Sequence, residues 1–181
     1  MTQLKEGADA DVVILASASH MGQLAESGLV RSPQIIALNS LAIAVSPSLA
    51  GQVTSMGQIR DTDLQIAICV ESAPCGVLAL AYASFIGLDL SSATREPNVK
   101  AVLAKVERDE VDVGFVYVTD LRSSTVDLGR LMNSGAERHT TSYSLAVSAN
   151  STKVREARDF ASLFGTETAS DVMVHFGFEL P

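Results

Sequence analysis

The sequence predicts an α/β protein of two lobes. Short apolar, strand-like runs alternate along the chain with helical patterns, which is typical of an α/β chain with a largely parallel sheet. Two longer extended segments, 34–46 and 141–149, bracket a middle region of the size of a small domain. We therefore expect two lobes joined by two crossover segments, with the second lobe over 41–144 and the first lobe built from 1–40 and 145–181.

Three elements are expected before the middle region. Residues 11–16 (DVVILA) form a short continuous apolar run, which predicts a buried strand. The segment after it places Met21 and Leu24 on one helical face and ends at Gly28, a residue type that helices prefer just past their last turn. Residues 34–47 contain β-branched side chains without helical periodicity, so they predict an extended segment.

The middle region is expected to begin with a short helix over 54–61, a buried strand over 64–70 and an apolar helix over 74–86. An amphipathic helix over 96–109 and two strands over 111–118 and 124–132 should follow. In the amphipathic helix Val99, Val102 and Val106 recur at helical spacing, which predicts one face in the core and one in water. An extended run over 141–149 and helices over 152–164 and 167–175 complete the chain.

Composition indicates a folded protein and disfavours several partners. The chain has 181 residues, of which 47% are hydrophobic and 19% charged, as in globular domains. A net charge of −8 argues against nucleic acid and anionic membranes as partners, because both attract basic surfaces. The apolar run within 77–88 is too short to span a membrane. The first residues (MTQLKEGADADVV) lack the apolar core of a secretory signal, so the chain as given is expected to stay in the cytoplasm or to have lost its leader.

The helix start at Pro74, Cys75 and Gly76 is the first candidate site. Proline is favoured in a first helical turn, and glycine lets a ligand or another backbone come close. A helix N-terminus can bind an anion, and it also lowers a thiol pKa, so Cys75 is alternatively a nucleophile or a metal ligand. The plainer interpretation is a small, partly buried side chain, because no histidine is placed by sequence as its base. A local bridge between Cys69 and Cys75 is compatible with the sequence but is not required by it.

Three loops of the middle region carry hydrogen-bond donors without charge. They are ESAPCG after the 64–70 strand, EPNV at the start of the 96–109 helix, and VYVTD at the end of the 111–118 strand. Ligands of α/β sheets bind beyond the carboxyl ends of strands, where these loops lie. They offer backbone N–H groups near Gly76 and Val99 and the phenol of Tyr117, which on spacing alone is equally a core aromatic residue.

Metal binding and catalysis find little support in the sequence. The histidines His20, His139 and His175 have no metal-ligand spacing with one another or with the cysteines. The acidic residues near 107–112 are typical of a solvated helix end. No enzyme activity, metal site or cofactor is therefore expected.

Four stretches in chain order carry a resemblance to one family. They are GADADVVILAS, ESAPCG, NVKAVLAKVERDEVDVGFVYVTD and the terminal FGFELP. Together they resemble the molybdate-binding proteins of bacterial ABC transporters, which have the type II periplasmic binding fold, over essentially the whole chain. The resemblance implies a periplasmic or cell-surface protein that hands molybdate or tungstate to a transporter permease. It also implies that neutral donors hold the oxyanion between two lobes, here the backbone N–H groups of Cys75, its neighbour Gly76 and Val99, and the hydroxyl of Tyr117.

The sequence departs from the family pattern in two places. Cys75 stands where the family usually has alanine, which a peptide N–H donor tolerates. The family's initial strand–helix–strand segment, with two serine loops, has no counterpart, so the first lobe is expected to be truncated. Losing those donors would weaken binding by about 3–6 kcal/mol. Unpaired strand edges would favour a homodimer formed by strand or segment exchange. The alternative function is therefore a relative with weak or no oxyanion binding that acts as an oligomeric or regulatory domain.

Overall fold

The computed structural model describes residues 2–131 and 134–181, which form two compact units. Unit 1 combines the residues up to Leu38 with Thr141–Pro181, and unit 2 is the continuous segment Asn39–Thr140. The unit boundaries fall within two long strands, β2 (Val30–Val45) and β7 (Thr140–Ser148). The sequence analysis places the corresponding lobe boundaries after residues 40 and 144.

Unit 2 is built around three parallel strands. β3 (Ile66–Cys69) pairs in parallel with both β4 (Thr94–Glu96) and β5 (Val113–Tyr117). The second half of β2 pairs antiparallel with β5, and the two-residue β6 (Gly129–Arg130) pairs antiparallel with β2. The helices of unit 2 are η1 (Pro47–Leu49), α3 (Met56–Asp61), α4 (Pro74–Ile86), α5 (Val99–Glu107), α6 (Val118–Ser123) and η2 (Ala136–Arg138).

Two expectations about the sheet are wrong. The sheet is mixed rather than largely parallel, because β2 lies antiparallel to β5. Parallel neighbours need a helical crossover between them, as α4 and α5 provide for β3, β4 and β5, and no such unit joins β2 to β5. The strand expected over 124–132 is reduced to Gly129–Arg130, and its residue 132 lies outside the described part of the chain.

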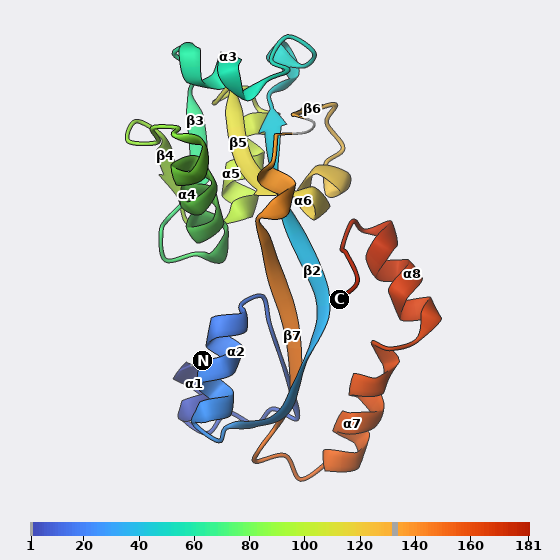
Figure 1. The fold of residues 1–181 in the computed structure, drawn as a ribbon. Coiled ribbons are helices and arrows are strands. Elements are labelled where there is room, and N and C mark those ends of the chain that lie inside the picture. Colours follow the sequence, from blue (N-terminus) through green and yellow to red (C-terminus); the bar gives the residue numbers. More distant parts are fainter. Residues whose placement is uncertain (1, 132–133) are drawn as a thin grey trace. The chain divides into compact units, whose positions relative to one another are not determined.

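The core of unit 2 lies on both faces of this sheet. Along β2, Leu41 and Ile43 belong to one buried cluster and Ala42 and Ala44 to another, because successive side chains of a strand point to opposite faces. The first cluster includes Tyr82 of α4 and Phe115 of β5. The second includes the buried face of α5, with Val102, Leu103 and Val106, as the helical spacing predicts. Figure 1 shows α4 and α5 beside the strands of this unit.

Unit 1 has a smaller sheet and a smaller core. β1 (Val12–Leu15) pairs antiparallel with β7, which neighbours β2 in the strand order. Within this unit α1 (Thr2–Lys5) and α2 (Ala18–Glu26) lie on one side of these strands, and α7 (Val154–Leu163) and α8 (Glu167–His175) lie on the other (Figure 1). The buried cluster consists of Met21, Leu24, Val30 and Ala146.

Helices α7 and α8 leave apolar side chains in water. Ala157 is the buried residue of α7, and none of the nine described residues of α8 is buried. The exposed large apolar side chains of this region are Phe160, Leu163, Val172, Val174 and Phe176. Such a face normally packs against another element, so the described residues do not complete the core of unit 1.

Within residues 2–131 and 134–181, the helices are too short or too polar for any of them to cross a lipid bilayer.

Candidate functional site

The three parallel strands of unit 2 end at one edge of the sheet. β3 ends at Cys69 and is followed by α4. β4 ends at Glu96 before α5, and β5 ends at Tyr117 directly before α6. Because the strands are parallel, the three helix N-termini gather at their carboxyl ends. Such an edge is where α/β sheets bind ligands.

Cys75 is joined to Cys69 by a disulfide that ties the start of α4 to the end of β3. Both residues are buried, with exposed fractions of 5% and 0%. This bond excludes the interpretation of Cys75 as a thiol nucleophile or a metal ligand, and it gives the side chain a structural role instead. The peptide N–H of Cys75 stands at the second position of the helix, where no intrahelical carbonyl is available to accept it.

Gly76 has a steric reason to be glycine. A Cβ atom at this position would lie 2.1 Å from the carbonyl oxygen of Val70 and 2.8 Å from that of Cys69. Only glycine therefore lets α4 start so close to the end of β3. The N–H of Gly76 donates to the carbonyl of Ala73, at an N–O distance of 3.0 Å, which closes the first turn of the helix.

Val99 is the first residue of α5, and its backbone is held by contacts on either side. The Oδ1 atom of Asn98 caps the helix by accepting the N–H of Ala101 at 3.0 Å. Further along α5, Lys105 Nζ lies 2.6 Å from Glu96 Oε1, and this hydrogen bond lowers the pKa of the Glu96 carboxyl. This contact joins the last turn of α5 to Glu96 at the end of β4, while the Asn98 cap orders its first turn.

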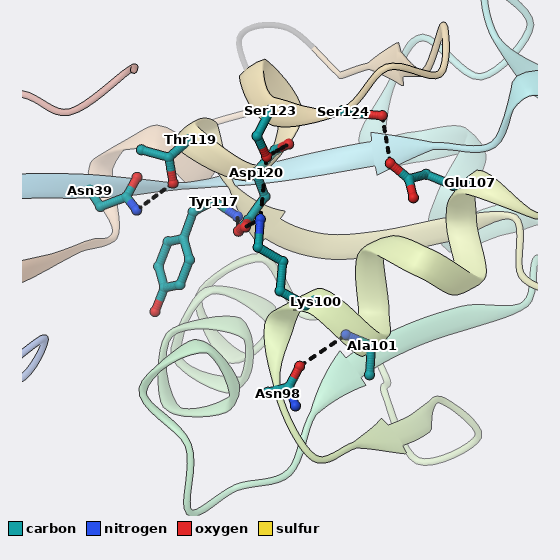
Figure 2. A network of polar contacts seen from close by, with 10 residues as sticks. All are labelled: Asn39, Asn98, Lys100, Ala101, Glu107, Tyr117, Thr119, Asp120, Ser123 and Ser124. Carbon is teal, nitrogen blue, oxygen red and sulfur yellow. Dashed lines mark hydrogen bonds and ion pairs between the residues drawn. The ribbon is translucent and has the colours of Figure 1, made fainter. Parts of the chain in front are cut away.

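Tyr117 is the last residue of β5 and is 6% exposed. Its N–H donates to Asp120 Oδ2 at 3.0 Å, and Asp120 Oδ1 lies 3.0 Å from Lys100 Nζ. Next to Asp120 in the sequence, Thr119 accepts a hydrogen bond at its Oγ1 atom from Asn39 Nδ2, at 2.8 Å. Figure 2 shows these contacts beside Tyr117.

The structure brings the predicted residues into one region. Cys75 and Tyr117 belong to the same buried cluster, Val99 packs against it, and Gly76 follows Cys75 on α4. Sequence reasoning missed Asp120, although an acidic residue three positions after a helix cap is a known signal for a contact with the cap residue. Lys100 gave no such signal, because its partner lies on another helix.

The histidines form no metal site in the described residues. Across residues 2–131 and 134–181, no three His, Cys, Asp or Glu side chains are arranged to hold an ion. The ring of His139 packs edge-on against Tyr82, with 5.2 Å between the ring centroids. It therefore belongs to the surroundings of the core of unit 2.

The chain is similar to known proteins over nearly its whole length. The sequence model described as "Bacterial extracellular solute-binding protein" matches residues 1–179. A relative in Mycobacterium tuberculosis, "Molybdate-binding protein ModA", is 27% identical over 181 residues, which cover 99% of this chain and 69% of the relative.

Two solved structures have the same fold. The "substrate binding domain of putative molybdenum ABC transporter from Clostridium difficile" superposes with a TM-score of 0.81 at 23% identity, over 99% of this chain and 81% of that one. The periplasmic molybdate-binding protein of Azotobacter vinelandii superposes with a TM-score of 0.84 at 18% identity, over 99% and 82%. These likenesses show the α/β architecture of the periplasmic binding proteins.

Proposed function

Because the chain belongs to the family of bacterial extracellular solute-binding proteins, we propose that it binds molybdate or tungstate as the substrate-binding component of an ABC transporter. Members of this family bind solutes and are not enzymes. The observation that carries the proposal is the gathering of Cys75, Val99 and Tyr117 at the carboxyl edge of the parallel strands of unit 2. The proposed partners are the oxyanion and a transporter permease, and no cofactor is needed.

Neutral donors at this edge suit a tetrahedral dianion. The N–H groups of Cys75 and Val99 stand in the first turns of α4 and α5, where the helix dipole favours negative charge. The hydroxyl of Tyr117 adds a side-chain donor, and the N–H of Gly76 borders the same turn. A net charge of −8 is compatible with such a site, because these dipoles act over short distances.

The disulfide between Cys69 and Cys75 supports a location outside the cytoplasm. Disulfides persist in oxidising compartments such as the periplasm and are rare where thiols are kept reduced. An extracytoplasmic location is also that of the extracellular family to which the chain belongs. We therefore favour the periplasm or the cell surface over the cytoplasm.

Calorimetric titration of the 181-residue chain tests the proposal. Molybdate and tungstate are expected to bind, with little heat from sulfate. Tyr117→Phe should weaken molybdate binding about tenfold, the effect of losing one hydrogen bond to a charged ligand. Tyr143→Phe is the matched control, because Tyr143 lies on β7 in unit 1, where its ring packs against Phe178. Equal affinities of the two variants for molybdate would argue against the assignment of Tyr117.

A second candidate function rests on unit 1. Its exposed apolar face on α7 and α8 favours association with another copy of the chain. In this alternative the protein binds oxyanions weakly or not at all and serves as an oligomeric or regulatory domain. A chain that is dimeric by light scattering and gives no heat with molybdate or tungstate would support the alternative over the transport function.

A further inference from the structure

One buried carboxylate links two elements of the candidate site. Asp120 is 4% exposed and lies in α6, just after the strand that ends at Tyr117. One of its oxygens accepts the Tyr117 N–H, and the other lies 3.0 Å from the ammonium group of Lys100. Lys100 directly follows Val99 in the first turn of α5. A single side chain therefore connects the backbone of one proposed donor with the helix turn that presents another.

A second contact strengthens the link at this end of α5. Lys100 Nζ also donates to Ser123 Oγ at 3.3 Å, and Ser123 Oγ donates to the backbone carbonyl of Asp120 at 2.9 Å. The ammonium group thus contacts both the start and the end of the short helix α6. These contacts fix α6 against the first turn of α5.

The opposite end of α5 has a comparable link to α6. Ser124 Oγ donates to Glu107 Oε1 at 2.7 Å, where Glu107 is the last residue of α5. Figure 2 shows Lys100 in contact with Asp120, beside the backbone of Tyr117, and the contact between Ser124 and Glu107 further along the same helix. The two links join the same pair of helices, but only the first touches the turns that carry proposed donors.

We propose that Asp120 and Lys100 are positioning residues for oxyanion binding, because together they hold the Tyr117 backbone and the first turn of α5 in a fixed relation. The inference rests on the proposed function for its ligand. Neither side chain is assigned a direct contact with the oxyanion. Lys100 also neutralises a carboxylate that would otherwise repel a dianion at the neighbouring donors.

The two residues should contribute unequally. The Lys100 side chain is 66% exposed, so the ion pair itself is screened by water and is worth little. Asp120 is buried and receives the N–H of Tyr117, so its removal leaves that donor without its acceptor. Loss of Asp120 should therefore weaken binding more than loss of Lys100.

Titration with sodium molybdate measures this order directly. Asp120→Ala is expected to raise the Kd about tenfold and Lys100→Met about threefold. The matched control Ser124→Ala breaks the link at the far end of α5 and should leave the Kd within about twofold of the unsubstituted chain. If Asp120→Ala does not fold, Asp120→Asn takes its place, with a smaller expected loss because its amide oxygen can still accept the Tyr117 N–H. The double variant Asp120→Asn, Lys100→Met should lose less than the product of the single losses, because both act through one contact.

Amide hydrogen exchange on the ligand-free variants tests the positioning without any ligand. Asp120→Ala, or Asp120→Asn in its place, should accelerate exchange in both 98–102 and 117–120, and Ser124→Ala should not. Equal losses of affinity in Asp120→Ala and Ser124→Ala, or unchanged exchange at the start of α5, would overturn the inference. If the unsubstituted chain gives no heat with molybdate, tungstate or sulfate, the proposed function fails, and the exchange data alone then decide whether the pair positions these turns.

Discussion

Unit 2 encloses most of its large apolar side chains, with Phe85 on α4 as the main exception at 77% exposed, whereas unit 1 leaves more of its own in water. In unit 2 both faces of the sheet are covered, and residues such as Phe115 and Tyr82 are fully buried. In unit 1 the apolar residues of α7 and α8 remain exposed, among them Phe160, Leu163 and Phe176. The proposed oxyanion donors all belong to the enclosed unit.

This difference shows that a segment can form regular secondary structure without being packed into a closed core. α7 and α8 form complete helices, and Thr166 caps α8 as Asn98 caps α5, yet several of their large apolar side chains stay exposed. Most of the stability of a helix in a protein comes from packing of its apolar face. Unit 1 should therefore be the less stable unit and the one that gains most from additional contacts.

Truncation of one phenylalanine in each unit should give the largest contrast. Phe115→Ala opens a cavity in the closed core of unit 2 and is expected to cost about 3–5 kcal/mol of unfolding free energy. Phe160→Ala removes a side chain that is 45% exposed and should cost less than about 1 kcal/mol. Urea unfolding followed by circular dichroism measures both. Similar losses would mean that α7 is covered in solution.

A glycine-to-alanine substitution should have opposite effects on stability in the two units, because the space around the added methyl group differs. Gly76→Ala would force a Cβ atom against the carbonyl of Val70 and should cost about 3 kcal/mol. Gly22→Ala in α2 meets no atom within 4 Å and should stabilise unit 1 by about 0.5–1 kcal/mol, because alanine is the better helix former. A neutral Gly76→Ala in urea unfolding would show that α4 can start further from β3.

Removal of the disulfide between Cys69 and Cys75 should lower the stability of unit 2. Replacing both Cys69 and Cys75 by alanine frees a short loop in the unfolded chain and should cost about 2 kcal/mol. Thermal unfolding with and without a reductant provides the measurement. The reductant should lower the melting temperature of the unsubstituted chain but not that of the double variant, and equal responses would place the thiols outside a disulfide.

The smallest expected effect is a pH-dependent one at Tyr82. Burial raises the pKa of this phenol above its ordinary value of 10.0, and its hydroxyl donates to the Ser134 carbonyl at 2.7 Å. The folded state therefore keeps the proton more firmly than the unfolded chain does. This contribution is complete below pH 10 and is lost as the pH rises from there through the pKa of the folded state.

Tyr82→Phe tests this assignment. It should cost about 1 kcal/mol near pH 8, because the Ser134 carbonyl loses its donor. It should also flatten the fall in unfolding free energy above pH 10. An unchanged slope in the variant would assign the alkaline loss to other groups.

Structural features with a cause close by in the sequence could be predicted, and features set by distant parts of the chain could not. The limits of α4 followed from Pro74 at its start and Gly87 in a left-handed conformation after its end, and both signals act within one turn. The buried face of α5 followed from helical spacing. The polar three-residue strand β4 and the antiparallel pairing of β2 with β5 were missed, because both are decided by neighbours distant in the chain.

The candidate site shows the same division. The start of α4 could be singled out because Pro74 and Gly76 are local signals for a helix start, whereas the helix expected over 96–109 begins only at Val99. The disulfide could not be deduced, since it depends on a Cα–Cα distance of 5.7 Å that spacing does not fix. The contact between Lys100 and Asp120 joins two helices, so no periodicity within either helix could reveal it.

The division of the chain between the units also has a consequence for synthesis on the ribosome. Unit 2 is one continuous segment, so all its strands have emerged once residue 140 has left the exit tunnel. In unit 1, Val12 pairs with Val147, and β1 must wait through most of translation for its partner strand β7. Closing so long a loop costs entropy before any contact compensates for it, which slows folding. We therefore expect the enclosed unit to fold first and the nascent edge of β1 to be the segment that most needs protection by a chaperone.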